Sequence, residues 1–317
     1  MLKFKYLLYS MISWLINHWL FSRNARFHPI KFLRLFPRTV ITQVNGVSYN
    51  IDPLDQVEFN TFRGFSMGPE SIFSKYLAST LTKNDVFFDL GAHTGRHTLP
   101  AAKYVGPTGH VFAFEPIHTS FAKLHSNIAL NSFNNVVTIN KAVLDTPNEI
   151  IEIYIQPTIP MESTNTGDSS ISSLKMINQK LSTKLFVTTT TIDEIVMQHQ
   201  IDEIKLMKID VQGGELQVLN GALSTLKNNI IQNIYIEVHL RELQNLGENY
   251  LDILKLLNQY GTTYFFNSAL VNQSKKEIKI VTPTTLNEYF SESEVTSSGN
   301  QPSINAPEAQ LLWEKST

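Results

Sequence analysis

Cysteine is absent from this chain of 317 residues. Without thiols the protein has no disulfide, no thiolate metal site and no cysteine nucleophile, so three common kinds of site are excluded. An excess of basic charge is also lacking, since 26 lysines and arginines stand against 28 aspartates and glutamates. Proteins that bind nucleic acids usually carry a basic excess on one face. We therefore predict that the partner is not a nucleic acid.

The apolar run near the N-terminus is too short to span a membrane. Residues 6–21 contain no Lys, Arg, Asp or Glu, but a spanning helix needs about 20 apolar residues. Ser10, Ser13 and Asn17 fall on one stripe of a helix, which suits peripheral contact with a membrane interface. A helix packed on the domain or on a partner chain is the alternative that stays open. We predict a cytoplasmic protein whose membrane association, if any, uses this helix; its oligomeric state stays open.

The chain divides into four segments. They are an N-terminal apolar or amphipathic helical segment at residues 1–38, a hairpin and helix at 39–84, the core domain at 85–285 and a tail at 286–317. The hairpin is predicted from Asn45-Gly46, which stands between alternating apolar and polar residues. Residues 292–306 are rich in Ser, Pro, Asn and Gly, so we predict that the tail is partly disordered.

Strand-like and helix-like patterns alternate through the core domain. The predicted strands lie at residues 86–90, 110–115, 136–140, 150–155, 185–191, 204–209, 233–238, 263–266 and 278–281. The predicted helices of the core lie at residues 95–104, 119–130, 214–226 and 250–260, and the helix of the preceding segment lies at residues 69–81. This alternation predicts an α/β fold with a doubly wound, mostly parallel sheet. We expect a polar insertion at residues 158–182 to lie near the active face and to shape the substrate pocket.

The run VFFDLGAHTG, residues 86–95, predicts a buried strand, a tight glycine turn and the start of a helix. Asp89 stands two residues before Gly91, the first glycine of the turn. A carboxylate there disfavours a diphosphate, because like charges at close range repel each other. A cationic ligand that bears an amine is favoured instead. S-adenosylmethionine (SAM), with its sulfonium and ammonium groups and no phosphate, is such a ligand.

Two further strands end in residues suited to a nucleoside, since open α/β sheets bind ligands at the carboxyl ends of their strands. Glu115 closes the second core strand, where its carboxylate can accept both ribose hydroxyls, and Pro116 sets the loop that follows. Asn140 and Ala142 follow at the end of the next strand, where adenine would lie. We expect Asn140 to contact the edge of the base and Ala142 to pack on its ring.

Two later strands end in residues suited to acid–base chemistry. Side chains alternate along a strand, so Lys208 shares a face with Asp210, and Glu237 with His239. We expect these strands to be neighbours, which would bring Asp210, Glu237 and His239 together. We also expect a carboxylate beside Lys208, because a lysine is almost never fully buried unpaired. His239 is the first candidate for a general base, since its ordinary pKa lies near the working pH, and Asp210 is the second.

Together these residues resemble the FkbM family of SAM-dependent methyltransferases. The matching segments are VFFDLGAHTG, AFEP, SSISSL, TTTIDEI, LMKIDVQGGELQVLNGA and IEVH, at residues 86–95, 113–116, 169–174, 189–195, 206–222 and 236–239. The resemblance implies a Rossmann-like, seven-stranded fold of the class I methyltransferases, with SAM as the cofactor.

The resemblance also implies roles for residues at both ends of the site. The implied cofactor contacts are Asp89, Gly91 and Gly95 at the methionine end and Glu115 at the ribose, and we also expect Ala92 and His93 of the same turn to contact the cofactor. Asp210 is expected to face the sulfonium, with Glu215 and His239 near the methyl acceptor. Two positions depart from the usual pattern of the family: His93 replaces an asparagine, and Gln212 replaces a frequent glutamate.

The predicted activity is O-methylation of a hydroxyl on a sugar, a glycan or a related metabolite, and the acceptor class rests on the resemblance alone. A metal-assisted version would use Asp210, Glu237 and His239 as ligands, although we predict no metal. An NAD(P)-dependent oxidoreductase is disfavoured, because Gly91 and Gly95 lack the spacing and the third glycine of G-x-G-x-x-G. A membrane-tethered binding module without catalytic activity is the remaining alternative.

Overall fold

The computed structural model describes residues 39–52, 69–155, 169–170, 183–266, 281–286 and 308–316. The predicted interfacial helix at residues 6–21 lies outside the described residues, as do most of the polar insertion and residues 292–306 of the tail. Among the helices that are described, none has the length and apolar character needed to cross a membrane.

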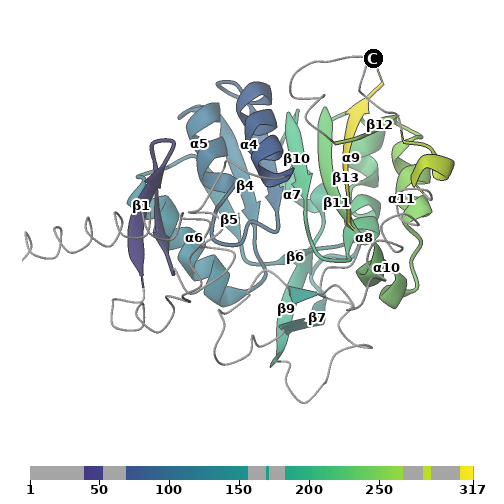
Figure 1. Cartoon of the computed structure of the whole chain (residues 1–317), viewed down its shortest axis with the longest axis horizontal. Coiled ribbons are helices and arrows are strands. Elements are labelled where there is room, and N and C mark those ends of the chain that lie inside the picture. The colour runs from purple at the N-terminus through teal and green to yellow at the C-terminus, as the bar shows by residue number, and fades with distance from the viewer. Residues whose placement is uncertain are drawn as a thin grey trace, which may run out of the picture.

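Seven strands form the main sheet, in the order β12-β13-β11-β10-β3-β4-β5 (Figure 1). In that order they are Gly261–Phe265, Glu308–Lys315, Asn233–His239, Leu206–Ile209, Val86–Leu90, His110–Phe114 and Val136–Ile139. Neighbouring strands are parallel, except that β13 runs antiparallel to both β11 and β12. The predicted doubly wound, mostly parallel, seven-stranded sheet is confirmed.

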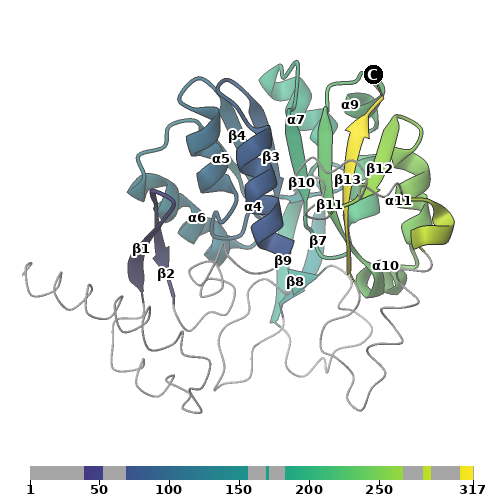
Figure 2. The ribbon, with the colours of Figure 1, turned by 45° about the horizontal axis from the view of Figure 1, so that its top comes forward.

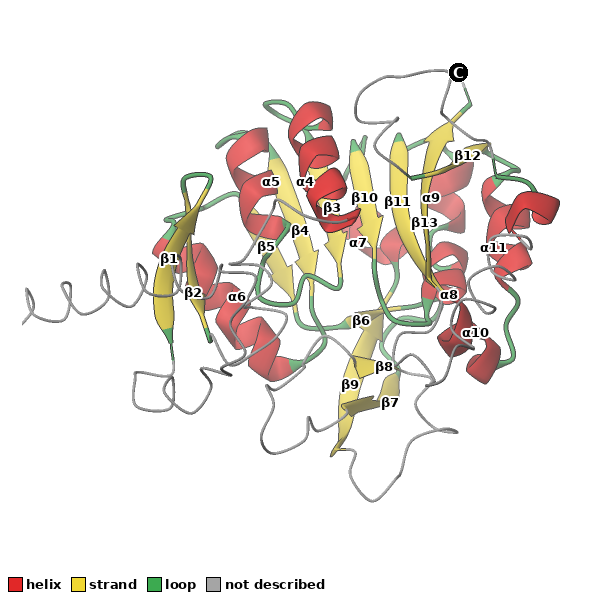
Figure 3. Cartoon of the chain, in the orientation of Figure 1, coloured by secondary structure: helices red, strands yellow, loops and turns green. Residues whose placement is uncertain are grey.

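Helices cover both faces of this sheet (Figures 1 and 3). The first face carries α4 (Pro69–Thr80), α5 (Thr98–Val105) and α6 (His118–Leu130). The second face carries α7 (Ile192–His199), α8 (Glu215–Asn220), α9 (Leu223–Lys227) and α11 (Tyr250–Leu257), while α10 (Leu240–Leu246) directly follows β11. Because both sides of each strand are covered, the strands are apolar almost throughout. Phe87 packs on the first face and Phe88 on the second.

A separate hairpin of β1 (Val40–Val44) and β2 (Val47–Ile51) lies along α6, as Figure 2 shows. Its turn residues Asn45 and Gly46 have φ angles of 52° and 73°, which a type I′ turn requires at both central positions. The predicted hairpin is confirmed.

A second, smaller sheet stands below the main sheet in the view of Figure 1. Its order is β6-β9-β7-β8, formed by Ala142–Val143, Thr183–Thr190, Ile150–Ile155 and Ser169–Ser170. Its inner side chains pack around Ile117, the residue that follows the Glu115-Pro116 turn. The interruption of the α/β alternation near residue 148 is therefore the point at which the chain forms this extra sheet.

The predicted C-terminal boundary of the core needs correction. We predicted that the core ends at residue 285 and that a tail follows, but β13 lies inside the main sheet between β11 and β12. The physical reason is its apolar content, since Leu311, Leu312 and Trp313 are all buried. Charged residues at both ends of the strand and the polar stretch before it conceal this short apolar pattern in the sequence.

The helix predicted over residues 214–226 is divided into α8 and α9. A Cβ atom on Gly221 would lie 2.0 Å from the carbonyl oxygen of Leu144, so the chain passes too close to another backbone there for any side chain. Helices α7 and α10 were not predicted. The sequence does contain a signal for α7, the Thr-x-x-Glu capping pattern at Thr191 and Glu194. In the structure the hydroxyl of Thr191 accepts a hydrogen bond from the Glu194 N–H, as this pattern predicts.

Candidate active site

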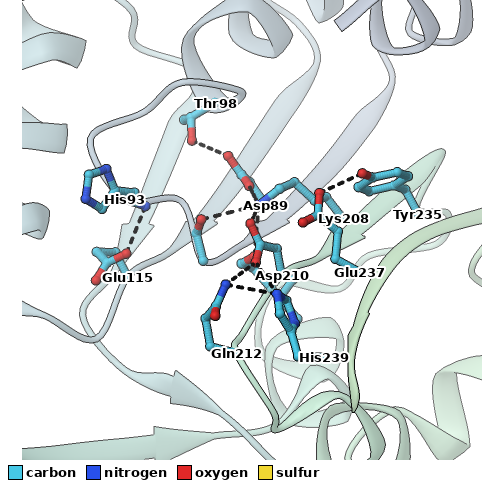
Figure 4. A network of polar contacts seen from close by, with 12 residues as sticks. Asp89, His93, Thr98, Glu115, Lys208, Asp210, Gln212, Tyr235, Glu237 and His239 are labelled. Atoms are coloured by element: carbon cyan, nitrogen blue, oxygen red, sulfur yellow. Dashed lines mark hydrogen bonds and ion pairs between the residues drawn. The ribbon is translucent and has the colours of Figure 1, made fainter. Parts of the chain in front are cut away.

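Six polar side chains gather at the carboxyl ends of β3, β4, β10 and β11, on the first face of the sheet. They are Asp89, Glu115, Lys208, Asp210, Glu237 and His239 (Figure 4). The parallel register places Lys208 beside Asp89 on one side and beside Tyr235 on the other. Alternate residues of a strand share a face, so the strand ends present their polar residues to one side and their apolar residues to the other.

Lys208 lies at the centre of this group and is almost fully buried. Its Nζ is 3.4 Å from Asp89 Oδ1 and 3.4 Å from Asp210 Oδ2, and it donates to the carbonyl oxygens of Leu90 and Gly91. Burial opposes the charged form, but the neighbouring carboxylates outweigh it and hold the pKa of Lys208 above its usual range. The expected carboxylate partner is confirmed, and Lys208 is a permanent cation that joins two strand ends.

Asp89 is fully buried beneath the glycine turn. Its Oδ2 accepts a hydrogen bond of 2.6 Å from the hydroxyl of Thr98, and its Oδ1 faces Lys208. The expectation that Asp89 itself meets a cationic ligand does not fit this burial. The side chain of Asp210 is 27% exposed, so a ligand at the strand ends meets Asp210 first.

The glycine turn is closely packed against the neighbouring strand. Gly91 has a φ of +77°, and a Cβ atom there would lie 2.0 Å from the carbonyl oxygen of Asp210. Gly95 has a φ of +96°, and its Cβ would lie 2.9 Å from a side-chain carbon of Leu124 in α6. Gly91 is therefore required both for the backbone angle and for the space, and Gly95 for the backbone angle.

Most N–H groups of the turn are bonded within the protein. Those of Gly91 and Ala92 donate to the carbonyl oxygen of Phe114, and that of Gly95 donates to the carbonyl oxygen of Ala92. The N–H of His93 donates to Glu115 Oε2 at 2.8 Å. These four groups are unavailable to an anion, in agreement with the argument against a diphosphate. Burial lowers the pKa of the His93 side chain to about 4, so its ring is neutral at pH 7.

The buried side chain of Glu115 accepts hydrogen bonds from two backbone N–H groups, one in the glycine turn and one after β4. Besides the bond from His93, its Oε1 accepts a hydrogen bond of 2.8 Å from the N–H of Ile117. Burial raises the pKa of Glu115 to about 7, although these two hydrogen bonds favour the ionised form. Each oxygen of a carboxylate has two lone pairs, so Glu115 keeps the capacity to accept two further hydrogen bonds.

The predicted adenine contacts lie beside Glu115. The side-chain nitrogen of Asn140 donates to the carbonyl oxygens of Glu115 and Pro116, at 2.8 and 3.0 Å. Asn140 thus fixes the turn after β4, and this donor is already used within the protein. Ala142 is buried in β6 and packs against Ile117.

His239 is held by Glu215 at one ring nitrogen and faces Gln212 with the other. Its Nδ1 is 2.7 Å from Oε1 of the fully buried Glu215, which also accepts the N–H of Gly213. Its Nε2 is 3.0 Å from Gln212 Nε2 and 4.0 Å from Asp210 Oδ1. Gln212 Nε2 also donates to Asp210 Oδ1 at 3.2 Å. The amide of Gln212 therefore stands between the two candidate bases, and it can donate to Nε2 of His239 only while that nitrogen carries no proton.

The pKa values of two groups at this site are shifted from their ordinary values. Burial opposes the imidazolium of His239, but Glu215, Asp210 and Glu237 outweigh burial and raise its pKa to about 10. The pKa of His239 in this environment thus lies above the ordinary value on which its choice as the base relied. Burial also favours the neutral acid of Asp210, but Lys208 and His239 lower its pKa. A cation bound beside Asp210 would lower the pKa of His239, because like charges disfavour its protonated form.

Asp210, Glu237 and His239 converge as expected. Each offers one ligand atom, and these atoms lie within 4.8 Å of one another. The chemistry of the set suits a divalent cation, but Lys208 already places a positive charge 3.4 Å from Asp210. Glu237 Oε1 also accepts a hydrogen bond of 2.6 Å from the hydroxyl of Tyr235.

Three residues of the site were not predicted. Tyr235 had a clear signal, because it lies two residues before Glu237 in one strand and must share its face. Thr98 is the first residue of α5, and its bond to Asp89 depends on the path of the turn. Gln212 has a φ of +57°, a left-handed conformation that no pattern in the sequence indicates for a glutamine.

The sheet order, with an antiparallel strand next to one edge and helices on both faces, is that of a class I methyltransferase, and acidic side chains line its strand ends. Within this class, the model of the methyltransferase FkbM domain matches residues 89–264. Because this match covers more than half of the chain, the protein belongs to the FkbM methyltransferase family.

The chain is similar to two methyltransferases over about two thirds of their length. Hexuronic acid methyltransferase AglP of Haloferax volcanii is 26% identical over 187 residues, which cover 58% of this chain and 66% of that protein. Methyltransferase 1 of Beauveria bassiana is 24% identical over 160 residues, covering 47% and 63%. Methyltransferase FkbM of Methylobacillus flagellatus, a solved structure, matches 78% of this chain and 50% of that one, with a TM-score of 0.40 and 13% identity.

Proposed function

We propose that this protein transfers the methyl group of SAM to a hydroxyl of a sugar, a glycan or a related metabolite. The observation that carries the proposal is the pairing of His239 with the buried Glu215 beside the partly exposed Asp210. Carboxylates outnumber basic groups at these strand ends, which suits a cationic cofactor. The family supports methyl transfer, and the similarity to a hexuronic acid methyltransferase supports a sugar acceptor.

The residues at the strand ends fit SAM through their charge and their remaining hydrogen-bond capacity. Bound SAM supplies a methyl group on a positively charged sulfur that a nucleophile can displace. Glu115 would hold the ribose hydroxyls with the lone pairs that its backbone contacts leave, and Asp210 would lie nearest the positive charge. Alignment of the acceptor in such a site can lower the barrier by up to about 7–11 kcal/mol.

His239 would accept the proton of the acceptor hydroxyl at Nε2 while Glu215 holds Nδ1. A base oriented by a carboxylate at its second nitrogen is an arrangement suited to proton transfer. The amide nitrogen of Gln212 shows that a polar group can stand within hydrogen-bond distance of both His239 and Asp210. Because the pKa of His239 is high, this side chain must lose its proton before it acts, and the positive charge of SAM beside Asp210 would favour that loss.

A labelled-methyl transfer screen tests the proposal. Sugars, glycans and lipid-linked glycans serve as acceptors, and mass spectrometry of the product locates the new methyl group. With the true acceptor, His239→Ala and Asp210→Ala should each lower turnover, by about 10²–10⁴-fold for the general base. His110→Ala, at the exposed start of β4, is the control and should retain full turnover. Retained turnover in both site variants would refute the assignment of the base.

The pH dependence of turnover identifies the base more sharply. Glu215 is a main cause of the high pKa of His239, so Glu215→Gln should lower that pKa. If His239 is the base, the rise of turnover with pH should move to lower pH in this variant. A pH profile that stays in place would favour Asp210 as the base.

A metal-assisted transfer is the second candidate. The close approach of ligand atoms from Asp210, Glu237 and His239 favours it, whereas Lys208 opposes it. If a chelator abolishes turnover and added Mg²⁺, Mn²⁺ or Zn²⁺ restores it, a metal ion takes part in the transfer. Full turnover in the chelator would exclude it.

A further inference from the structure

The hairpin β1–β2 stands outside the main sheet, but one side chain connects it to the glycine turn, residues 91–95. This side chain is Asn127 of α6, which is 1% exposed. Its Oδ1 accepts the N–H of Asn50 in β2 at 2.7 Å, and its Nδ2 donates to the carbonyl oxygen of Thr94 at 2.9 Å. A single buried amide thus spans the hairpin and the turn.

Asn131, one helical turn later, binds the same strand but not the glycine turn. Its Oδ1 accepts the N–H of Ser48 at 2.8 Å, and its Nδ2 donates to the Ser48 carbonyl oxygen at 2.7 Å and to the Asn127 carbonyl oxygen at 2.8 Å. Ser48 and Asn50 are alternate residues of β2, so these two asparagines together satisfy one edge of the strand. The chain therefore contains a matched pair of anchors, of which Asn127 alone reaches the turn.

The part of the turn that Asn127 holds has an unusual backbone conformation. Thr94 is buried and stands between His93, with a φ of +50°, and Gly95, with a φ of +96°. A residue other than glycine at positive φ is strained and persists only when its surroundings fix it. The bond from Asn127 to Thr94 is one such constraint, and the packing of Leu124 of α6 against Gly95 is another.

We infer that Asn127 is a positioning residue for the glycine turn, and that docking of the hairpin through Asn127 sets the affinity of the turn for SAM. This inference rests on the proposed function, because it takes SAM as the ligand of the turn. Asn127 lies on α6 and bonds to Asn50, Thr94 and Asn131, so its effect on the cofactor passes through the backbone of Thr94. Turnover at saturating SAM should therefore stay unchanged when Asn127 is altered.

The matched pair allows a sharp test. Replacing either asparagine by aspartate keeps the acceptor for the β2 N–H and removes the amide donors. Asn127→Asp loses the bond to Thr94, whereas Asn131→Asp loses only bonds to the Ser48 and Asn127 carbonyls. Calorimetric titration with S-adenosylhomocysteine should show affinity about tenfold lower or more for Asn127→Asp, and wild-type affinity for Asn131→Asp.

Equal weakening in both variants, or wild-type affinity in Asn127→Asp, would overturn the inference. If Asn127→Asp does not fold, Asn127→Ala and Asn131→Ala give the same comparison without a buried charge. Hydrogen exchange at residues 91–95 is the second readout and should accelerate in the Asn127 variant alone. If the wild-type protein does not bind the probe, the proposed cofactor is wrong, and the exchange measurement still decides whether Asn127 holds the turn.

Discussion

Single residues set the charge at the strand ends, and Lys208 does so for two carboxylates that it contacts directly. Replacing Lys208 by methionine would leave the buried Asp89 and the partly exposed Asp210 close together without a cation between them. Removing one partner of a buried ion pair costs about 3–5 kcal/mol, because the remaining charge stays desolvated. We expect Lys208→Met to lower the free energy of unfolding by that amount in chemical denaturation.

Lys184→Met is the matched control for this prediction. Lys184 also pairs with a carboxylate, that of Glu152, but both side chains are substantially exposed. Solvent screens such pairs, so this variant should unfold almost as the wild type does. Equal loss of stability in the two variants would mean that the burial of Lys208 does not account for its contribution to the free energy of unfolding.

Glu115 predicts a pH dependence of cofactor binding. Only the ionised carboxylate can accept both ribose hydroxyls, and burial raises its pKa to about 7. The affinity for S-adenosylhomocysteine should therefore be constant above about pH 8 and should fall as the pH drops below 7, approaching about tenfold per unit. Glu115→Gln should bind weakly with no such dependence. Wild-type binding that stays constant from pH 5.5 to 8 would contradict the prediction.

At the scale of elements, the contact of the β3 turn with the end of β10 predicts an unequal effect of two glycine substitutions. Gly91→Ala places a Cβ atom 2.0 Å from the backbone of Asp210, whereas Gly247→Ala, at a similar φ of +79°, meets no atom within 4 Å. Gly247→Ala should cost about 1–2 kcal/mol for the backbone angle alone. Gly91→Ala should cost more than about 4 kcal/mol. Thermal unfolding measures both, and equal costs would refute the close approach.

The elements themselves were largely predictable, because their signals are local. Alternation around Asn45-Gly46 indicated the hairpin, and the apolar run before Asp89 indicated a strand covered on both faces. The division of the helix at Gly221 was not predictable, and neither was the close approach of Gly221 to the carbonyl oxygen of Leu144, a residue from a distant part of the chain. The same holds for the bridge by Gln212, which exists only once two strand ends stand side by side.

The candidate site was likewise predictable only where local patterns in the sequence determine it. Alternation within strands placed Lys208 with Asp210 and Glu237 with His239, and the parallel sheet brought the two pairs together. The raised pKa of His239 could not be predicted from the sequence, because it depends on the burial of Glu215 and on the distance between the two side chains. Burial likewise decided that Asp210 rather than Asp89 is open to a ligand.

At the scale of the whole molecule, the position of β13 predicts that the main sheet depends on it. A chain that ends at Ala306 lacks the strand between β11 and β12, and with it the buried residues Leu311 and Trp313. Calorimetry should show no cooperative unfolding transition for this chain. A chain that ends at Lys315 is the control and should unfold almost as the wild type does. A cooperative transition in the shorter chain would show that β13 is dispensable.

Because β13 is the last strand in the chain but lies inside the main sheet, this sheet can be completed only at the end of synthesis. β3, β4 and β5 leave the ribosome early and are neighbours in the sheet, so these three strands can begin to pair while translation continues. The strand that carries Glu237 and His239 leaves later, and its outer edge stays without a partner until residues 308–315 clear the exit tunnel. The edge of the sheet beside Glu237 and His239 is therefore the last part of the main sheet to be completed during synthesis.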